Sequence, residues 1–186
     1  NYGHGGGGIS LAWGSSALAV RETVGMSPTD AAVIGSGIIG LTSARLLQDA
    51  GWKVTIYTRD VARHTTSNVA AGEWSPFSVD DPAVSSDEFK SKLNWAARIS
   101  HHAYTNLGGS DYGIRWLETY VLNDSADPDD EDALFNDLFP HRATLGPGEH
   151  PFRARRKLSS SLGPHRRTAR RPPRLVRLPR HERTRA

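Results

Sequence analysis

The sequence predicts an α/β fold built on one βαβ unit, and successive patterns in its first third support that prediction. Residues 31–34 form a short apolar run with the length of a buried strand, and residues 35–40 are rich in glycine. Residues 41–50 then repeat apolar side chains at helical spacing, and the inner side of the predicted helix is expected to carry Leu41, Ala44, Leu46 and Leu47. Residues 53–57 return as a second apolar run, which completes a pattern of about 30 residues, the size of a βαβ unit.

The segment before this unit predicts a turn followed by a helix. Glycine fills most of residues 1–8, and glycine alone enters left-handed backbone conformations without steric cost. A helix is expected to begin at Ser10 and to end before Gly25. The apolar side chains that can line one side of it are Leu11, Ala12, Ala17, Leu18 and Val20.

After the unit, a polar loop is expected through residue 68. A second helix is predicted over residues 87–107, with Ser85 or Ser86 as its N-cap, because apolar side chains recur there at spacings near 3.6 residues. Two consecutive glycines would end it. Residues 113–122 alternate apolar and polar side chains and therefore predict a strand.

Charge is divided unevenly along the chain. Residues 153–186 hold 13 of the 23 basic and one of the 20 acidic residues, so their net charge is +12 against −9 for residues 1–152. This Arg/Pro-rich stretch shows no helical or strand periodicity and cannot bury enough apolar surface to offset its ordering entropy. The sequence predicts that it is a disordered C-terminal tail.

Composition excludes several classes of site. The chain has no cysteine, which rules out disulfides, cysteine-ligated zinc, iron–sulfur clusters and thiol nucleophiles. The acidic residues 124–132 lack the alternating Asp and the Gly of a calcium-binding loop, so they are interpreted as a solvated face and no metal is expected. No apolar run approaches the roughly 20 residues that span a bilayer, and residues 1–10 do not resemble a signal peptide. The expectation is a soluble, cytoplasmic protein.

The glycine-rich turn has the spacing G-x-G-x-x-G, and it lies where dinucleotide binding requires it, after a strand and before a helix. Gly35 permits the tight turn, Gly37 lets a pyrophosphate approach the backbone, and Gly40 allows the helix to pack closely on the sheet. The start of the helix supplies amide donors and a partial positive charge. The sequence therefore predicts a Rossmann-like dinucleotide site.

The turn alone leaves the choice between NAD and FAD open. An acidic residue after the second strand normally takes the ribose hydroxyls, and Asp60 is slightly late for that role. Arg59 could instead stack on adenine or meet a phosphate.

Three separated strings resemble the D-amino-acid oxidase family. Ala-Val-Ile-Gly-Ser-Gly-Ile-Ile-Gly-Leu at residues 32–41 resembles the motif that opens the family's chains. Thr-Thr-Ser-Asn-Val-Ala-Ala-Gly and the Trp and Pro-Phe that follow, at residues 65–77, resemble its second FAD-contacting loop. Asn-Tyr-Gly-His-Gly-Gly-Gly-Gly-Ile-Ser and the next Trp-Gly, at residues 1–14, resemble a signature usually found near the family's C-terminus.

The resemblance implies that the cofactor is FAD and assigns its contacts to groups of residues. The pyrophosphate would be held by Gly35, Ser36, Gly37, Ile38, Ile39 and Gly40. The adenosine would meet Arg59 and Asp60, and phosphate or ribitol would meet Thr65, Thr66 and Ser67. The isoalloxazine would lie beside Ala71, Gly72 and Trp74, with Gly5, Gly6, Gly8, Ile9 and Ser10 at its pyrimidine edge. His4 is interpreted as structural rather than as a base.

The resemblance further implies oxidative deamination of D-amino acids to keto acids, ammonia and hydrogen peroxide, with a D-amino acid and oxygen as the small-molecule partners. D-aspartate and glycine stay open as substrates. The family's active-site tyrosines and its substrate-binding arginine have no matching motif here, so no residue is assigned a catalytic role. The expected domain is therefore an incomplete Rossmann-like, FAD-binding α/β domain, and an inactive flavoprotein fragment stays an alternative.

The order of the motifs predicts three segments. Residues 1–25 carry the string typical of the family's C-terminus, residues 26–152 the FAD-binding region, and residues 153–186 the basic tail. A circular permutation or a junction of two gene copies explains this order, because Met26 and the polar residues after it resemble a fresh start.

Two further partners come into question, nucleic acid and a second copy of the chain. The tail could attract nucleic acid, but it lacks interleaved aromatic residues, so nucleic acid is not expected as a partner. A homo-oligomer stays open. A peroxisomal location stays an alternative to the cytoplasm for a eukaryotic source, although the terminal Thr184-Arg-Ala is not the usual peroxisomal tripeptide.

Overall fold

The computed structural model describes residues 1–77, 79–81, 83–109, 111–118, 134, 135 and 137–139. Its elements in chain order are α1 (Gly8–Arg21), β1 (Asp30–Ile34), α2 (Ile38–Asp49), β2 (Lys53–Tyr57), η1 (Ala62–His64), α3 (Thr66–Val69) and α4 (Asp87–Asn106). All of them belong to one compact unit. Residues 134, 135, 137 and 138 form short turns of 3-10 helix and belong to a second unit.

The two strands form a parallel sheet that α2 crosses. β1 and β2 pair in register from Asp30 opposite Lys53 to Ile34 opposite Tyr57, and α2 contacts both strands. Val33, which is buried, lies on the face toward α2, while its neighbour Ile34 is 90% exposed on the other. The predicted βαβ unit, and with it the α/β fold class, is confirmed.

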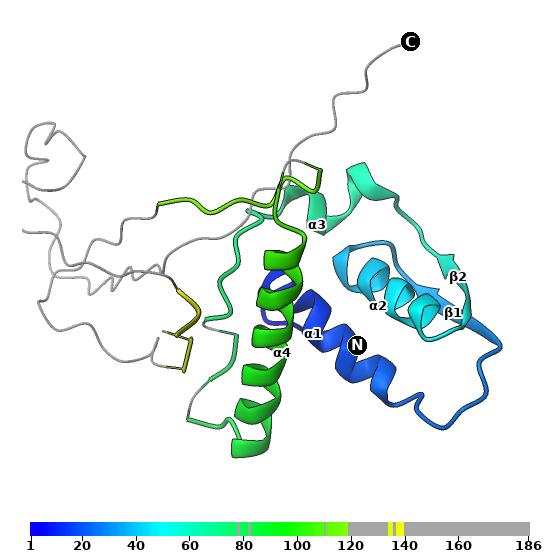
Figure 1. Cartoon of the computed structure of the whole chain (residues 1–186), viewed down its shortest axis with the longest axis horizontal. Coiled ribbons are helices and arrows are strands. Elements are labelled where there is room, and N and C mark those ends of the chain that lie inside the picture. The colour runs from blue at the N-terminus through cyan, green and yellow to red at the C-terminus, as the bar shows by residue number, and fades with distance from the viewer. Residues whose placement is uncertain (78, 82, 110, 119–133, 136, 140–186) are drawn as a thin grey trace, which may run out of the picture. The chain divides into compact units, whose positions relative to one another are not determined.

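Helix α1 lies between α2 and α4 and contacts both (Figure 1). Small residues let the helices approach closely. A Cβ atom added at Gly14 would lie 2.0 Å from the Ala96 carbonyl oxygen, and the Gly14 amide donates to Ser100 Oγ at 2.8 Å. Toward α2, the buried Ser16 and Thr42 hydroxyls are 2.8 Å apart. The helix predicted to begin at Ser10 is confirmed, with its first turn starting at Gly8.

The second predicted helix is also confirmed. α4 begins after Ser86, whose hydroxyl accepts a hydrogen bond from the Phe89 amide at 3.1 Å. This N-cap satisfies one of the amides that have no partner inside the helix. The last helical residue is Asn106, and Gly108 and Gly109 follow the C-cap Leu107, as the sequence predicts.

The predicted strand over residues 113–122 is wrong where the structure describes it. Residues 111–118 form a turn and irregular backbone, and Ile114 makes only isolated bridges with Gly108 and Gly109. Ile114 is buried, whereas Trp116 is 49% exposed, so the alternation produces no continuous inner face. Gly113 adopts φ = 64°, which breaks the extended backbone at the start. Residues 119–122 lie outside the described residues.

Three smaller expectations need correction. α2 begins at Ile38 rather than at residue 41, because the end of the glycine turn is already helical. Leu41, which was expected on the inner side of this helix, is 46% exposed, and the buried positions are the smaller Thr42 and Ala44. Thr42 faces α1, where its hydroxyl donates to the Ala12 carbonyl at 3.3 Å, and the adjacent Leu41 is turned by about 100° toward the outer side of the helix. The polar loop expected through residue 68 contains η1 and α3.

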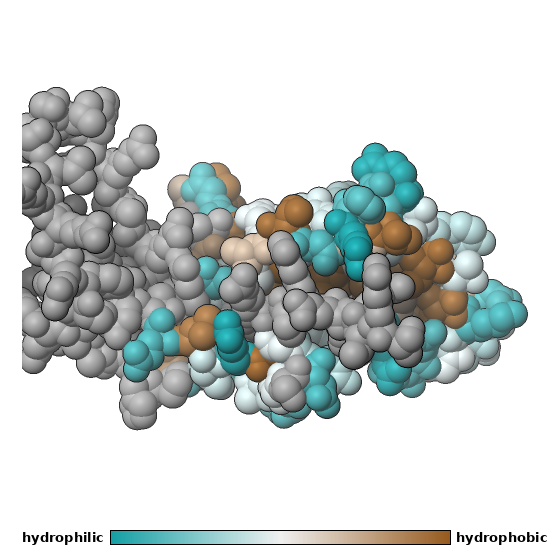
Figure 2. Space-filling model, turned by 90° about the horizontal axis from the view of Figure 1, so that it is seen from above, coloured by the Kyte–Doolittle hydropathy of each residue, from teal (hydrophilic) through white to brown (hydrophobic). Residues whose placement is uncertain are grey.

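Hydrophobic side chains also lie at the surface. Figure 2 shows them in brown, interrupted by hydrophilic residues. Among the described helices, none combines the length and apolar character that crossing a membrane requires. The acidic residues 124–132 and the predicted tail at 153–186 lie outside the described residues.

Candidate functional site

The glycine turn joins the end of β1 to the start of α2. The Gly35 amide donates to the Tyr57 carbonyl at 2.7 Å, which places the turn at the carboxyl end of the sheet. Gly35 has φ = 98°, a conformation that side chains disfavour. A Cβ atom on Gly40 would lie 2.0 Å from the Gly35 carbonyl oxygen, so only glycine lets helix and turn approach this closely.

The first amide of α2 points toward a serine hydroxyl. Gly37 is the N-cap and has extended backbone, with φ = −73° and ψ = 178°. The first amides of a helix have no acceptor within it, and here the Ile38 amide donates to Ser67 Oγ at 2.8 Å. A Cβ atom at Gly37 would lie 3.2 Å from the same oxygen. The glycine turn, the helix start and Ser67 thus have the chemistry that an anionic group requires.

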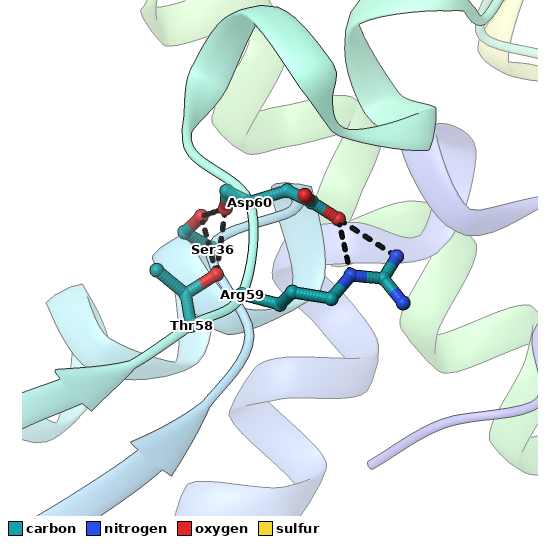
Figure 3. Close-up of polar contacts among 4 residues, drawn as sticks. All are labelled: Ser36, Thr58, Arg59 and Asp60. Atoms are coloured by element: carbon teal, nitrogen blue, oxygen red, sulfur yellow. Dashed lines mark hydrogen bonds and ion pairs between the residues drawn. The ribbon is translucent and has the colours of Figure 1, made fainter.

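A second set of polar residues follows β2, beside the glycine turn. Arg59 donates to Asp60 Oδ2 from Nε at 2.8 Å and pairs with it from a terminal nitrogen at 2.7 Å (Figure 3). The hydroxyls of Ser36 and Thr58 each donate to the Asp60 carbonyl oxygen at 2.6 Å. Of the two residues predicted to meet adenosine, Asp60 is therefore bonded directly to the glycine turn, and Arg59 is joined to it through the Asp60 carboxylate.

The N-terminal glycines form a separate turn. Gly5 and Gly6 have positive φ angles of 54° and 88°, and the Gly7 amide donates to the His4 carbonyl at 2.8 Å. A Cβ atom at Gly5 would lie 2.5 Å from the Val79 carbonyl oxygen. The turn therefore rests against the chain that follows the second predicted flavin loop.

Ser10 and Ile9, at the start of α1, are held by that loop and by α4. The Ser75 amide donates to Ser10 Oγ at 2.7 Å, and Ser10 Oγ donates to the Glu73 carbonyl at 3.3 Å. Tyr104 donates from its hydroxyl to the Ile9 carbonyl at 2.5 Å. Burial raises the pKa of the Tyr104 phenol, so the group stays protonated and remains a donor.

The other residues of the second predicted flavin loop differ in burial and in contacts. Trp74 is fully buried, with its ring centroid 4.8 Å from that of His101, and Gly72 is buried with φ = 72°. Ala71 is exposed. Thr65 makes only local contacts, to the Ala62 carbonyl and with the Asn68 side chain, and Thr66 is exposed at the start of α3.

His4 contacts Ser15 rather than any group of the glycine turn at β1. Its Nε2 lies 2.9 Å from Ser15 Oγ. Burial, and then the positive charge of the N-terminal amino group, lower the pKa of His4 below its ordinary value of 6.5. This hydrogen bond to a neighbouring turn of α1 agrees with the structural interpretation.

The structure thus gathers most of the predicted residues into two clusters and leaves Thr65 and Thr66 outside both. The first cluster contains the glycine turn with Arg59, Asp60 and Ser67, and the second, the signature cluster, contains residues 5–10 with residues 71–75. Thr58 and Tyr104 are absent from the predicted set. The sequence signal for Thr58 is a hydroxyl directly before Arg59-Asp60, whereas Tyr104 is 95 positions from Ile9 and gives none.

A groove of about 420 Å³ lies elsewhere, at the C-terminal ends of α1 and α2. Its walls are mainly apolar and include Val20, Met26, Leu46 and Trp52. It is at the opposite end of α2 from the glycine turn and is therefore not the nucleotide site. Within the described ranges, no group of acidic and histidine side chains could hold a metal ion.

Comparison with known proteins identifies one family. A family model described as "FAD dependent oxidoreductase" matches residues 30–167, which extends past the predicted boundary at residue 152. The D-amino-acid oxidase of Streptomyces coelicolor is 38% identical over 88 residues, 46% of this chain and 25% of that protein. The D-amino acid oxidase of Dugesia ryukyuensis is 34% identical over 110 residues, 58% of this chain and 31% of that protein.

The matched part is a limited share of these relatives. The chain spans 25% of the length of one and 31% of the other. No solved structure matches the chain significantly.

Proposed function

This chain belongs to the FAD-dependent oxidoreductase family, and from that premise we propose that it binds FAD at the glycine turn and serves in oxidative deamination of D-amino acids. FAD is the family's cofactor, which answers the choice between NAD and FAD that the turn leaves open. The names of the two relatives support D-amino acids as substrates and oxygen as the electron acceptor. The single observation that carries the proposal is the glycine turn between β1 and α2.

The residues at this turn fit a dinucleotide. A Cβ atom at Gly40 would lie 2.0 Å from the Gly35 carbonyl oxygen and one at Gly37 would lie 3.2 Å from Ser67 Oγ, so the turn is held close to the helix and to Ser67. The Ile38 amide has a hydroxyl oxygen as its acceptor at 2.8 Å. In the proposed complex, residues 35–40 hold the pyrophosphate and the Ser67 hydroxyl joins them. Asp60, three residues after the end of β2, accepts hydrogen bonds from the adenosine ribose.

The signature cluster is proposed to meet the isoalloxazine. FAD, when bound, supplies the acceptor for the hydride that leaves the substrate Cα. The chain's task is to orient the cofactor and to place backbone donors at its pyrimidine edge, where residues 5–10 would stabilise developing negative charge. The bonds of Ser10 to residues 73 and 75 keep the two arms of this cluster together.

The proposal is tested by loading the chain with FAD and measuring hydrogen peroxide. D-Alanine is the first substrate, D-aspartate and glycine separate the alternatives, and L-alanine is the matched negative control. We expect peroxide with at least one of the first three and none with L-alanine. FAD that is bound but is not reduced anaerobically by any of them would contradict the oxidase assignment.

A second candidate is FAD binding without turnover, as in an inactive flavoprotein fragment. The observation that favours it is the outer face of the sheet, where Ile34 and Tyr57 are 90% and 61% exposed. Parallel sheets normally have both faces covered, so an oxidase would require further structure there. In the assay above, this candidate gives saturable FAD binding and no peroxide.

A further inference from the structure

Two hydroxyls converge on one carbonyl oxygen beside the glycine turn. Ser36 Oγ and Thr58 Oγ1 each donate to the Asp60 carbonyl at 2.6 Å, and they lie 3.0 Å from one another (Figure 3). Each hydroxyl has one hydrogen and a carbonyl has two lone pairs. Both hydrogens are therefore used on Asp60, and the Asp60 carbonyl accepts two hydrogen bonds.

This arrangement joins two segments that are 24 positions apart in the chain. Ser36 occupies a variable position of G-x-G-x-x-G, so the pyrophosphate turn needs only its backbone. The Ser36 side chain has a separate role, because its hydrogen bond holds Asp60, three residues after the end of β2, against the turn. We name Ser36, Thr58 and the Asp60 carbonyl the hydroxyl clamp.

The clamp fixes the backbone from which the Asp60 carboxylate extends. Arg59 makes both of its contacts to Oδ2 of that carboxylate. Oδ1 has no partner among the described residues and can accept from a ligand hydroxyl. The Asp60 side chain is 37% exposed, so it is open to a ligand, while the Arg59 side chain is 92% exposed and can lie over a ring.

We propose that Ser36 and Thr58 are positioning residues for the adenosine half of FAD. The inference rests on the proposed function, namely that FAD binds at the glycine turn. The clamp sets the distance between the pyrophosphate turn and the Asp60 carboxylate, which the adenosine ribose must match. It therefore contributes to affinity for FAD and not for FMN, which has no adenosine.

The experiment compares FAD and FMN titrations, followed by flavin fluorescence, in the full chain and in Ser36→Ala and Thr58→Val. Each variant removes one hydroxyl from a partly exposed loop and leaves the backbone amides in place. We expect the dissociation constant for FAD to rise about fivefold in each variant, the effect of one lost hydrogen bond. The constant for FMN is expected to be unchanged.

Two control variants accompany the measurement. Ser36→Thr keeps a hydroxyl at the clamp and should restore FAD affinity. Ser27→Ala removes an exposed serine hydroxyl that precedes β1, at the end of the strand opposite to the clamp, and should leave both constants unchanged. Thermal unfolding of each variant shows whether the fold is retained. Because the two clamp variants remove different hydroxyls, either one tests the clamp if the other does not fold.

The outcomes separate the clamp from the proposed function. No saturable FAD binding by the unmodified chain overturns both. FAD binding that is unchanged in Ser36→Ala or Thr58→Val, with a retained fold, overturns the clamp alone. Equal losses of FAD and FMN affinity also overturn it, because the hydroxyls would then act on the phosphate or on the fold.

Discussion

The helix layer and the outer face of the sheet differ sharply in how they are packed. Between α1 and its neighbours, glycine, serine and threonine let backbones approach until one added carbon would overlap a carbonyl. On the outer face of β1 and β2, Ile34 and Tyr57 are mostly exposed. The N-terminal segment resembles a signature from the other end of family chains, yet it is more closely packed than the outer face of the sheet. Sequence order does not decide which segments share a core.

The largest effect on stability should come from adding a methyl group at Gly14, where α1 crosses α4. Gly14→Ala places a carbon 2.0 Å from the Ala96 carbonyl oxygen, so the helices must separate. We expect the free energy of unfolding to fall by about 2 to 3 kcal/mol, measured by urea denaturation. Gly8→Ala is the matched control, because its added carbon has only the His4 Cβ, at 4.0 Å. Equal effects of the two would show that this crossing is loosely packed.

A smaller effect is expected at the seam between α1 and α2. Thr42 donates to the Ile38 carbonyl at 2.8 Å and lies 2.8 Å from the Ser16 hydroxyl. Thr42→Val keeps the shape and leaves Ser16 without this partner, which should cost about 1 to 2 kcal/mol in urea denaturation. Thr55→Val makes the same change on the exposed sheet face and should cost almost nothing. A larger loss at Thr55 would contradict the contrast between the two regions.

The outer sheet face itself should tolerate polar substitution. Ile34→Thr changes a side chain that is 90% exposed, so the free energy of unfolding should move by less than about 0.5 kcal/mol. The adjacent Val33→Thr brings a hydroxyl into the buried face and should cost about 1 to 2 kcal/mol. Thermal denaturation of both variants gives the comparison. A substantial loss from Ile34→Thr would mean that the outer face is covered in solution.

The smallest effect concerns pH at the N-terminal turn. The pKa of His4 is lowered by burial and then by the N-terminal charge, so the folded state binds the proton less readily than the unfolded chain. Its contribution to stability is complete above pH 6.5 and is lost as the pH falls through the lowered pKa. Comparing the pH dependence of unfolding in the unmodified chain and His4→Asn should show a shallower acid loss in the variant. Identical profiles would contradict this assignment.

The sequence predicts the elements that depend on local pattern. The βαβ unit and both long helices follow from periodicity and from capping residues such as Ser86. The roles of Gly35 and Gly40 follow because the turn needs a positive φ angle at the first and close contact between helix and turn at the second. The strand predicted at 113–122 fails because an alternating pattern does not supply a pairing partner. Contacts such as Tyr104 with Ile9 depend on helix packing, which spacing along the chain does not reveal.

The most direct test of the central claim, that the turn at the start of α2 holds the FAD pyrophosphate, is a fluorescence titration of FAD into the unmodified chain and Gly37→Trp. The added ring must occupy the space beside Ser67 Oγ, 3.2 Å from the Cβ position, and block approach to the α2 amides. Leu41→Trp places the same ring on the exposed side of α2 as a control. We predict saturable quenching that Gly37→Trp abolishes and Leu41→Trp retains. Equal binding by Gly37→Trp, or none by the unmodified chain, would contradict the claim.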